Sequence, residues 1–344
     1  MELEIKAKKL IEDGKFNEAI DLVKDVEQNA ETLMIQGRAY YELLEFEKSI
    51  EFYNKVIELD ENSAKAYNNR GNSKASLEQY EEAIVDYNKA IELNPEYSEA
   101  YFNRGLVYYN MKKILAAIAD YNKAIELDPE NFMAYNNRGN ARNYLRDYDE
   151  ALLDFDKSLE INSHHNTYFN RGVTKECLND FENAIEDYNK SLELKNDDVQ
   201  VLSKRAFAQY KLENYESAEK DYAKVLELSS DSVEALVSLG LVKHKLDKDE
   251  DALGLYTKAI ELKEDYADAY INRSIAAAKL GNYIMAENDL EKMFTFDIFR
   301  NDYLSTYNEI REILSEKNDE AAIVFLARLN EMSTRIKSQY VLEK

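Results

Sequence analysis

Residues 64–97 read AKAYNNRGNSKASLEQYEEAIVDYNKAIELNPEY, and the same pattern returns along most of the chain. Glycines recur in it at intervals of 33 or 34 residues, at Gly37, Gly71, Gly105, Gly139, Gly172 and Gly240. Between the last two, Ala206 stands at the position where the series would place another glycine. Both prolines, Pro95 and Pro129, are also 34 residues apart. A period of this length is typical of one helical hairpin stacked many times in a single direction.

Numbering from Ala64 as position 1 divides the chain into consecutive repeats. Their boundaries are 1–29, 30–63, 64–97, 98–131, 132–164, 165–198, 199–232, 233–266 and 267–300. The first repeat is shortened, and residues 301–344 lack the full pattern. Apolar residues recur at helical spacing in this last segment, at Ala322, Phe325, Leu329, Met332 and Ile336. We therefore predict a degenerate tenth hairpin that caps the apolar end of the stack.

Each repeat is predicted to contain two helices, helix A over about positions 2–14 and helix B over about positions 16–30. In the repeat from Ala64, helix B carries its apolar stripe at Ala83, Ile84, Tyr87 and Ala90. It ends before Pro95, because the residue preceding a proline avoids the helical region. Glycine inside helix A costs about 1 kcal/mol against alanine. We expect the small residues that recur at position 8 and at position 20 to let the backbones of the two helices approach closely.

Composition narrows the classes of partner. The chain has 344 residues, a formal charge of -24 and 33% charged side chains. Nucleic acid is not an expected partner, because affinity for phosphate backbones rests on basic side chains. The acidity favours solubility and would steer a basic partner toward the protein. No apolar run approaches the ~18 residues of a membrane span, and the first residues form no apolar leader. We expect no membrane partner and a cytoplasmic location.

Residues able to perform catalysis or bind a metal are few. The single Cys177 excludes a disulfide framework and has no histidine in register. His164 and His165 lie at a repeat boundary with no third ligand suggested, so a surface turn is the favoured interpretation. The chain contains no phosphate-binding loop, no dinucleotide-binding glycine motif and no HExxH. The sequence thus predicts a protein that is not an enzyme and uses no cofactor or metal.

The order Tyr-x-x-x-Gly, then Ala, then Tyr-x-x-Ala, then Pro resembles the tetratricopeptide repeat family over about residues 1–300. This resemblance implies an all-α fold, a right-handed superhelical α-solenoid of about nine helix hairpins plus the capping hairpin. It also implies that the A helices line a concave groove that holds extended peptides or partner helices. Positions 2, 5, 6, 9, 12 and 13 would face this groove.

Position 7, commonly leucine in that family, holds arginine in six repeats, and position 23 of the same repeats holds aspartate. The six predicted pairs are Arg70 with Asp86, Arg104 with Asp120, Arg138 with Asp154, Arg171 with Asp187, Arg205 with Asp221, and Arg273 with Asp289. The exceptions change together, Leu239 with Leu255 and Gln36 with Phe52. An arginine facing helix B needs an anion, so we predict bidentate pairs within each repeat. The alternative is that these arginines bind phosphate. The aspartates that recur in the same repeats argue against it.

Position 6 is an asparagine in five repeats: Asn69, Asn103, Asn137, Asn170 and Asn272. An amide both donates and accepts hydrogen bonds, so a row of asparagines can match the backbone of an extended peptide. The alternative is that these side chains bond the adjacent helix and set the stacking of repeats. Other predicted groove residues are Asn72, Asn140, Tyr109 and Tyr210.

Beyond residue 199 the groove positions become basic, at Lys204, Lys211, His244, Lys245 and Lys279. A carboxylate, a phosphate or an acidic motif could bind there. The alternative is that these cations arose by sequence drift at solvent-exposed positions and bind nothing.

The sequence as a whole predicts a non-catalytic protein–protein interaction scaffold that holds an extended peptide or partner segment in its groove. The partner would be a protein or peptide, either basic or with an acidic terminus. The alternative is a regulatory or assembly subunit that clasps a folded enzyme or self-associates as a homo-oligomer through its terminal helices.

Overall fold

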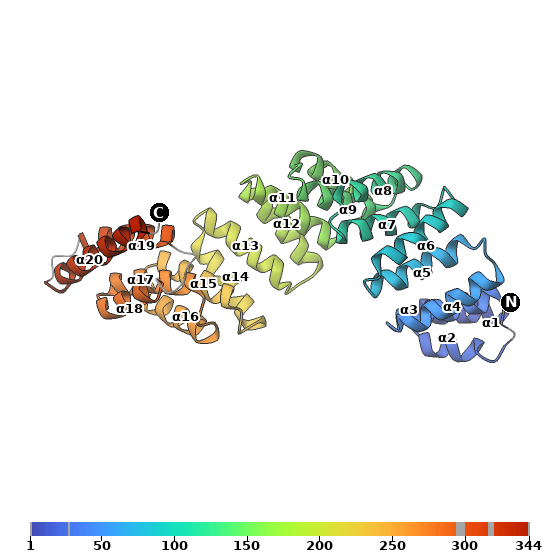
Figure 1. Ribbon diagram of the computed structural model, residues 1–344, viewed down its shortest axis with the longest axis horizontal. Coiled ribbons are helices and arrows are strands. Elements are labelled where there is room, and N and C mark those ends of the chain that lie inside the picture. Colours follow the sequence, from blue (N-terminus) through green and yellow to red (C-terminus); the bar gives the residue numbers. More distant parts are fainter. Residues whose placement is uncertain (1, 27, 294–299, 316–319, 343–344) are drawn as a thin grey trace. The chain divides into compact units, whose positions relative to one another are not determined.

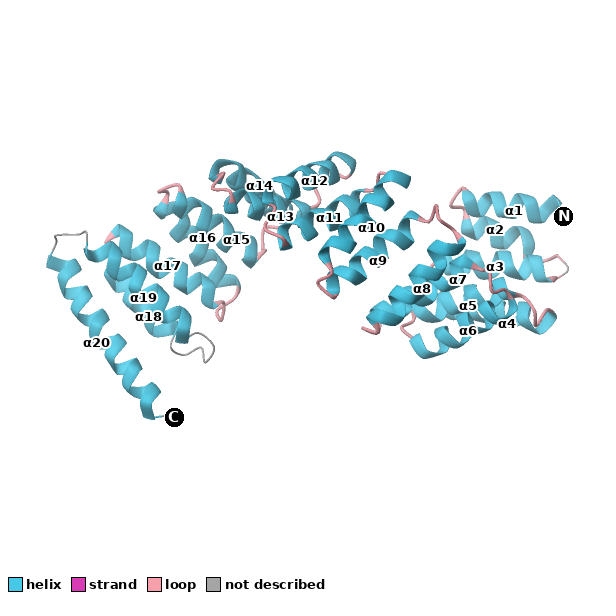
Figure 2. Cartoon of the chain, turned by 90° about the horizontal axis from the view of Figure 1, so that it is seen from above, coloured by secondary structure: helices cyan, strands magenta, loops and turns pink. Residues whose placement is uncertain are grey.

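The computed structural model describes residues 2–26, 28–293, 300–315 and 320–342, with the side chains of 300–304 and 332–342 left undescribed. These residues are helical throughout, apart from short connections, and contain no strand (Figures 1 and 2). The helices are α1 (Glu2–Glu12), α2 (Phe16–Val23), α3 (Ala30–Glu42), α4 (Phe46–Leu59), α5 (Ala64–Ser76), α6 (Tyr80–Leu93), α7 (Ser98–Asn110), α8 (Ile114–Leu127), α9 (Phe132–Tyr144), α10 (Tyr148–Ile161), α11 (His165–Cys177), α12 (Phe181–Leu194), α13 (Val199–Lys211), α14 (Tyr215–Leu228), α15 (Val233–Lys245), α16 (Asp249–Leu262), α17 (Ala267–Leu280), α18 (Tyr283–Met293), α19 (Arg300–Ser315) and α20 (Glu320–Leu342).

The chain divides into two compact units, Met1–Thr174 and Lys175–Lys344, which we call the N-terminal unit and the C-terminal unit. Within each unit, helix B of one repeat packs against helix A of the next, as α4 does against α5 and α16 against α17. The core of each hairpin is made of the alanines and aromatic residues that recur in helix B, among them Ala83, Tyr87 and Ala90.

A tight turn joins helix A to helix B, and its position 15 adopts the left-handed backbone conformation. Glycine takes this position in the first and last regular repeats, at Gly14 and Gly281. The other repeats place larger residues there: Leu44, Glu78, Lys112, Arg146, Asn179, Glu213 and Asp247. The next residue closes the turn, as Gln79 does when its backbone N–H donates to the carbonyl of Lys74 at 2.9 Å. This conformation costs non-glycine residues roughly 1–2 kcal/mol, so the packing of the hairpin must hold it in place.

The glycine at position 8 makes room for the aromatic ring at position 24. A Cβ built on Gly71 would lie 2.8 Å from the ring of Tyr87. The same crowding is found at Gly37, Gly105, Gly139 and Gly240, against Tyr53, Tyr121, Phe155 and Tyr256. The two helices thus approach closely at this glycine, and the ring at position 24 lies over it, a contact that the spacing did not predict.

The C-terminal helices do not continue the regular stacking. Instead of packing on α18, as a next helix A would, α19 packs on α17, and α20 contacts both α18 and α19. The rings of Tyr283 in α18 and Phe325 in α20 are stacked with centroids 5.2 Å apart. Ala322, Phe325 and Leu329 are buried, as their spacing predicts, whereas the side chains of Met332 and Ile336 lie outside the described residues. Within the described ranges, no helix combines the length and apolar character needed to cross a lipid bilayer.

Candidate interaction surface

The N-terminal unit contains a cleft of about 760 Å³ on the side of its A helices. Residues of α1, α3 and α5 form most of its walls, among them Arg38, Tyr41, Lys65, Asn69 and Asn72. Four of these five stand at positions 6, 9 or 12 of their repeats, and Lys65 stands at position 2. The buried side chains of Ile35, Tyr53 and Val56 also line the cleft. The cleft is thus lined in part by residues at positions that the sequence analysis assigned to a groove.

Several hydrogen-bond donors of this cleft are available to a ligand. Oδ1 of Asn72 accepts a hydrogen bond from the hydroxyl of Tyr87 at 2.8 Å, which leaves the amide nitrogen of Asn72 free to donate outward. Arg38 and Lys65 are both exposed, and no ion pair joins either of them to another described residue. Asn69 accepts from Nδ2 of Asn68 at 3.3 Å. Glu12 and Glu42 lie in the same cleft, so its walls carry both signs of charge.

The remaining asparagines of position 6 donate their amide nitrogens to acceptors of this chain. Nδ2 of Asn103 donates to Oδ1 of Asn68 in the preceding repeat, and Nδ2 of Asn170 donates in the same way to Oδ1 of Asn136, both at 3.1 Å. These two bonds link neighbouring repeats, as expected from the alternative in which the asparagines set the stacking of repeats. The other two amides bond their own helices, Asn137 to the carbonyl of Met133 at 2.9 Å and Asn272 to that of Asp268 at 2.7 Å. Asn140 is half-buried on the same face.

The two predicted groove tyrosines take part in packing. Burial raises the pKa of Tyr109, whose ring lies 5.9 Å from the ammonium of Lys112. Burial also raises the pKa of Tyr210, and its ring centroid is 5.6 Å from that of Tyr215. Both rings are only partly buried, so each keeps some exposed area.

Carboxylates neutralise most of the predicted basic patch of the C-terminal unit. Nζ of Lys204 lies 2.8 Å from Oε1 of Glu176, and Nζ of Lys279 lies 2.7 Å from Oδ1 of Asp247. Nδ1 of His244 is hydrogen-bonded to Oδ1 of the buried Asp249. Lys245 is exposed, and the ammonium of Lys211 lies 5.8 Å from the ring centroid of Phe207. Sequence reasoning missed the carboxylates because it followed only the groove positions that carry cations.

The arginines of position 7 contact the aspartates of position 23 in five repeats. Nε and Nη2 of each guanidinium donate to the carboxylate, with Nη2–Oδ1 distances of 2.5–2.7 Å. The structure thus brings together Arg70 with Asp86, Arg104 with Asp120, Arg138 with Asp154, Arg205 with Asp221, and Arg273 with Asp289. Arg171 and Asp187 lie in different units, so their pairing stays a prediction.

A further contact of these arginines was not predicted. Nη1 of Arg104 donates to Oδ1 of Asn88 in the preceding repeat at 2.5 Å. The same contact to position 25 of the preceding repeat is made by Arg70 to Asn54, Arg138 to Asn122, Arg205 to Asn189, and Arg273 to Thr257. Each guanidinium therefore joins three helices. The sequence contains a signal of this contact. Where Leu239 replaces the arginine of position 7, position 25 of the preceding repeat is Ala223, which has no side-chain acceptor.

Comparison with known families assigns these repeats. A family profile described as "Tetratricopeptide repeat" matches residues 98–131 and 132–165, and a second profile of the same description matches 204–267. A profile described as "TPR repeat" matches residues 37–77, 71–112 and 178–213. The chain belongs to the tetratricopeptide repeat family. Its helix pairs are tetratricopeptide repeats, a scaffold consistent with protein–protein interaction. No curated protein matches the sequence significantly.

Several solved structures are similar to this chain. YrrB, described as a TPR protein with an unusual peptide-binding site, is 25% identical over 53% of this chain and 95% of its own, with a TM-score of 0.49. The pilF protein of Pseudomonas aeruginosa is 21% identical over 61% of this chain and 96% of its own, with a TM-score of 0.54. A tetratricopeptide repeat protein from Parabacteroides merdae is 17% identical over 72% and 99%, with a TM-score of 0.52.

Proposed function

We propose that this chain is a non-catalytic interaction scaffold, and that the cleft of its N-terminal unit binds an extended segment of a partner protein. The observation that carries this proposal is the cleft itself. Its volume of about 760 Å³ lies within the range of ligand sites. Its lining combines buried apolar side chains with three donors that bond no described residue, namely Arg38, Lys65 and the amide nitrogen of Asn72, and a site that fixes the orientation of a peptide requires such a combination.

The available groups favour a ligand with hydrogen-bond acceptors. The amide nitrogen of Asn72, the guanidinium of Arg38 and the ammonium of Lys65 are all donors. They suit the carbonyl oxygens of an extended backbone or the carboxylate of an acidic terminus. Each neutral bond would contribute about 0.5–1.5 kcal/mol, so several are needed for useful affinity once ordering costs are subtracted.

The test is a screen of fluorescent peptides against the full chain, read by anisotropy. For any peptide that binds, Arg38→Ala with Asn72→Ala should weaken binding about 10-fold or more, since two donors to the ligand are lost. Asn162→Ala with Lys190→Ala, both exposed and outside the cleft, is the matched control and should change nothing. Equal loss in both variants would remove the cleft as the binding site.

Self-association is the second candidate, and one observation favours it. Ile323 and Val324 are adjacent on α20 and are 63% and 48% exposed. A patch of this kind on a terminal helix suits contact with a second copy. Light scattering at several concentrations tests it: a mass near 40.0 kDa at every concentration would exclude a homo-oligomer.

A further inference from the structure

Three successive repeats of the N-terminal unit carry an apolar row on the outer face of helix B. Position 22 holds Val85 in α6, Ala119 in α8 and Leu153 in α10, and all three side chains are exposed, Val85 to 65% and Leu153 to 61%. In the other full repeats this position is charged, polar or glycine, at Glu51, Glu186, Lys220, Gly254 and Asn288. A single exposed apolar residue needs no explanation, but a row of them on one face is typical of an interaction site.

A fourth apolar side chain, Leu115 of α8, lies beside this row and is 74% exposed. It stands at position 18, four residues before Ala119, and therefore on the same face of the helix. Six of the other seven full repeats place a carboxylate there, which the positive end of the helix dipole favours: Glu47, Glu81, Asp149, Glu182, Glu216 and Glu250. Leu115 gives up this contribution to helix stability and gains no buried contact in exchange, as expected of a residue that meets another molecule.

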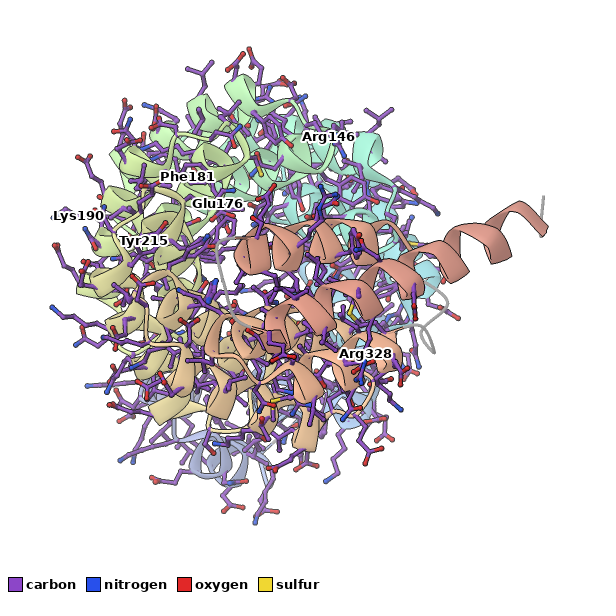
Figure 3. The ribbon with its side chains drawn as sticks, turned by 90° about the vertical axis from the view of Figure 1, so that its left-hand side faces the viewer. Arg146, Glu176, Phe181, Lys190, Tyr215 and Arg328 are labelled. Atoms are coloured by element: carbon purple, nitrogen blue, oxygen red, sulfur yellow. The ribbon has the colours of Figure 1, made fainter. Side chains whose placement is uncertain are left out.

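Charges of opposite sign flank the apolar row. Four residues before it, Glu81 of α6 and Asp149 of α10 are exposed and form no ion pair with any described residue. Four residues after it, at position 26, all three helices carry a lysine, namely Lys89, Lys123 and Lys157. The lysine of this position points outward from helix B, as Lys190 of α12 does at the left edge of Figure 3.

These lysines are able to contact a further carboxylate. Each of the three ammonium groups lies 2.6–2.9 Å from the glutamate three residues later in its own helix, in the pairs Lys89 with Glu92, Lys123 with Glu126, and Lys157 with Glu160. Exposed pairs of this kind contribute little to stability, and an ammonium has three donors. A carboxylate of another molecule can therefore bind beside the first one.

The order of carboxylate, apolar side chain and ammonium along these helices is complementary to itself when it is reversed. A two-fold axis that runs across the three helices, over position 22, places each helix antiparallel to the same helix of a second copy. Position 22 then meets position 22, and position 18 meets position 26. Glu81 thus meets Lys89 of the second copy. Asp149 meets Lys157 of the second copy in the same way.

The other possible two-fold arrangement is unfavourable. An axis parallel to the helices would place α6 opposite α10 of the second copy in the same direction, so that carboxylates would meet carboxylates and lysines would meet lysines. The antiparallel arrangement also accounts for Leu115, which meets Lys123 of the second copy, because the aliphatic part of a lysine side chain can cover an apolar residue.

We propose that the outer face of α6, α8 and α10 binds a second copy of this chain, and that the two copies form an antiparallel two-fold dimer. The apolar row lies at its centre, and pairs of carboxylate and ammonium flank it on both sides. This dimer depends neither on the cleft of the N-terminal unit nor on the exposed patch of α20.

The experiment is sedimentation equilibrium of the full chain at about 0.15 M salt, which screens exposed charges beyond about 8 Å and so limits the repulsion between two acidic copies. The mass of the unaltered chain should rise above 40.0 kDa with concentration. Val85→Asp with Leu153→Asp should raise the dissociation constant about 10-fold or more, because charge replaces the apolar contact. Ile323→Asp with Val324→Asp, on α20, should leave it unchanged.

Two charge variants test the antiparallel arrangement. Glu81→Lys with Asp149→Lys makes both flanks basic, and Lys89→Glu with Lys157→Glu makes both flanks acidic. Each variant alone should dimerise about 10-fold or more weakly, because like charges meet. An equimolar mixture of the two should recover the affinity of the unaltered chain, because opposite charges meet again, and this recovery requires that both variants are folded.

The matched control is Glu182→Lys with Glu216→Lys, which makes the same charge change at position 18 of two repeats that lack the apolar row. It should dimerise like the unaltered chain. The proposal is overturned if the unaltered chain keeps a mass of 40.0 kDa at every concentration, if the charge variants associate as strongly as the unaltered chain, or if their mixture recovers no affinity. Loss of the dimer in the α20 variant alone would also overturn it.

Discussion

The ring of Tyr256 lies so close to the backbone of Gly240 that a Cβ at residue 240 would be 2.4 Å from Cε1 of the ring. The corresponding distance in the other measured repeats is 2.8 Å. Tyr256 is 1% exposed, so the ring has nowhere to move without disturbing its neighbours. We expect Gly240→Ala to lower the free energy of unfolding by about 1–3 kcal/mol, measured as a shift in the midpoint of urea unfolding.

Gly254 provides the control, because it lies inside α16 and a Cβ added there would meet no neighbouring atom within 4 Å. At this position the alanine adds helix propensity without a clash. Gly254→Ala should raise the free energy of unfolding by about 0.5–1 kcal/mol. If both substitutions shift the midpoint in the same direction, ring contact does not explain the glycine at position 8.

The contacts that could be predicted from the sequence are those between residues that recur together within one repeat. Arg104 and Asp120 stand at fixed positions of one repeat, and their contact could be predicted from the way arginine and aspartate recur together. The bond from Arg104 to Asn88 crosses into the preceding repeat, so a reading within single repeats did not find it. The glycine at position 8 was noticed, but spacing alone could not distinguish a neighbouring alanine from the ring that covers it.

The inner face was harder to predict. The position of a residue in the repeat predicts which side of the helix it lies on, but it does not predict which hydrogen-bond partners its polar atoms have. Asn103 and Asn72 both face inward, yet the first donates to another repeat while the second keeps its amide nitrogen available. The packing of α19 on α17 could not be predicted, because residues 301–344 lack the repeat pattern that sets the register in the rest of the chain.

Asp120 tests what an Arg–Asp pair contributes. It is 5% exposed, and its carboxylate accepts from Nε and Nη2 of Arg104 at 2.8 and 2.6 Å. Asp120→Ala would leave that guanidinium partly buried without an anion. The expected loss in the free energy of unfolding is about 3–5 kcal/mol, measured from urea unfolding.

Arg104→Leu with Asp120→Leu should recover most of that loss, because the repeat 233–266 already has Leu239 and Leu255 at these positions. The same double change at Arg138 and Asp154 should recover less. There Nη1 of Arg142 also lies 2.7 Å from Oδ2 of Asp154 and would lose this contact, keeping only those to Glu150. Equal recovery in the two repeats would show that this second arginine does not matter.

Two tyrosines at position 24 differ in one hydrogen bond. The hydroxyl of Tyr121 is buried and has no partner among the described residues, whereas that of Tyr87 donates to Asn72 at 2.8 Å. Tyr121→Phe should leave the urea midpoint unchanged or raise it, as Phe155 already fills this position in the next repeat. Tyr87→Phe should cost about 1 kcal/mol. A larger loss for Tyr121→Phe would mean that its hydroxyl is satisfied after all.

Glu219 replaces the missing arginine contact between the repeats 199–232 and 233–266. Its carboxylate oxygens lie 2.8 Å from Nζ of Lys243 and 2.8 Å from Nζ of Lys248. Hydrogen bonds from Lys243 and then Lys248 hold the pKa of Glu219 below its usual value of 4.5. Because the folded state lowers this pKa, the stabilisation is present above pH 4.5 and is lost as the pH falls through the folded-state pKa.

Glu219→Gln should therefore destabilise the protein at pH 7, by less than about 1 kcal/mol because the site is solvated. The difference from the unaltered chain should shrink as the pH falls below about 4, and it should also shrink in high salt. Urea midpoints measured from pH 7 to pH 3 at two salt concentrations give both dependences. A difference that keeps its size at pH 3 would mean that Glu219 acts through packing, since a protonated carboxyl and an amide would then be equivalent toward the two lysines.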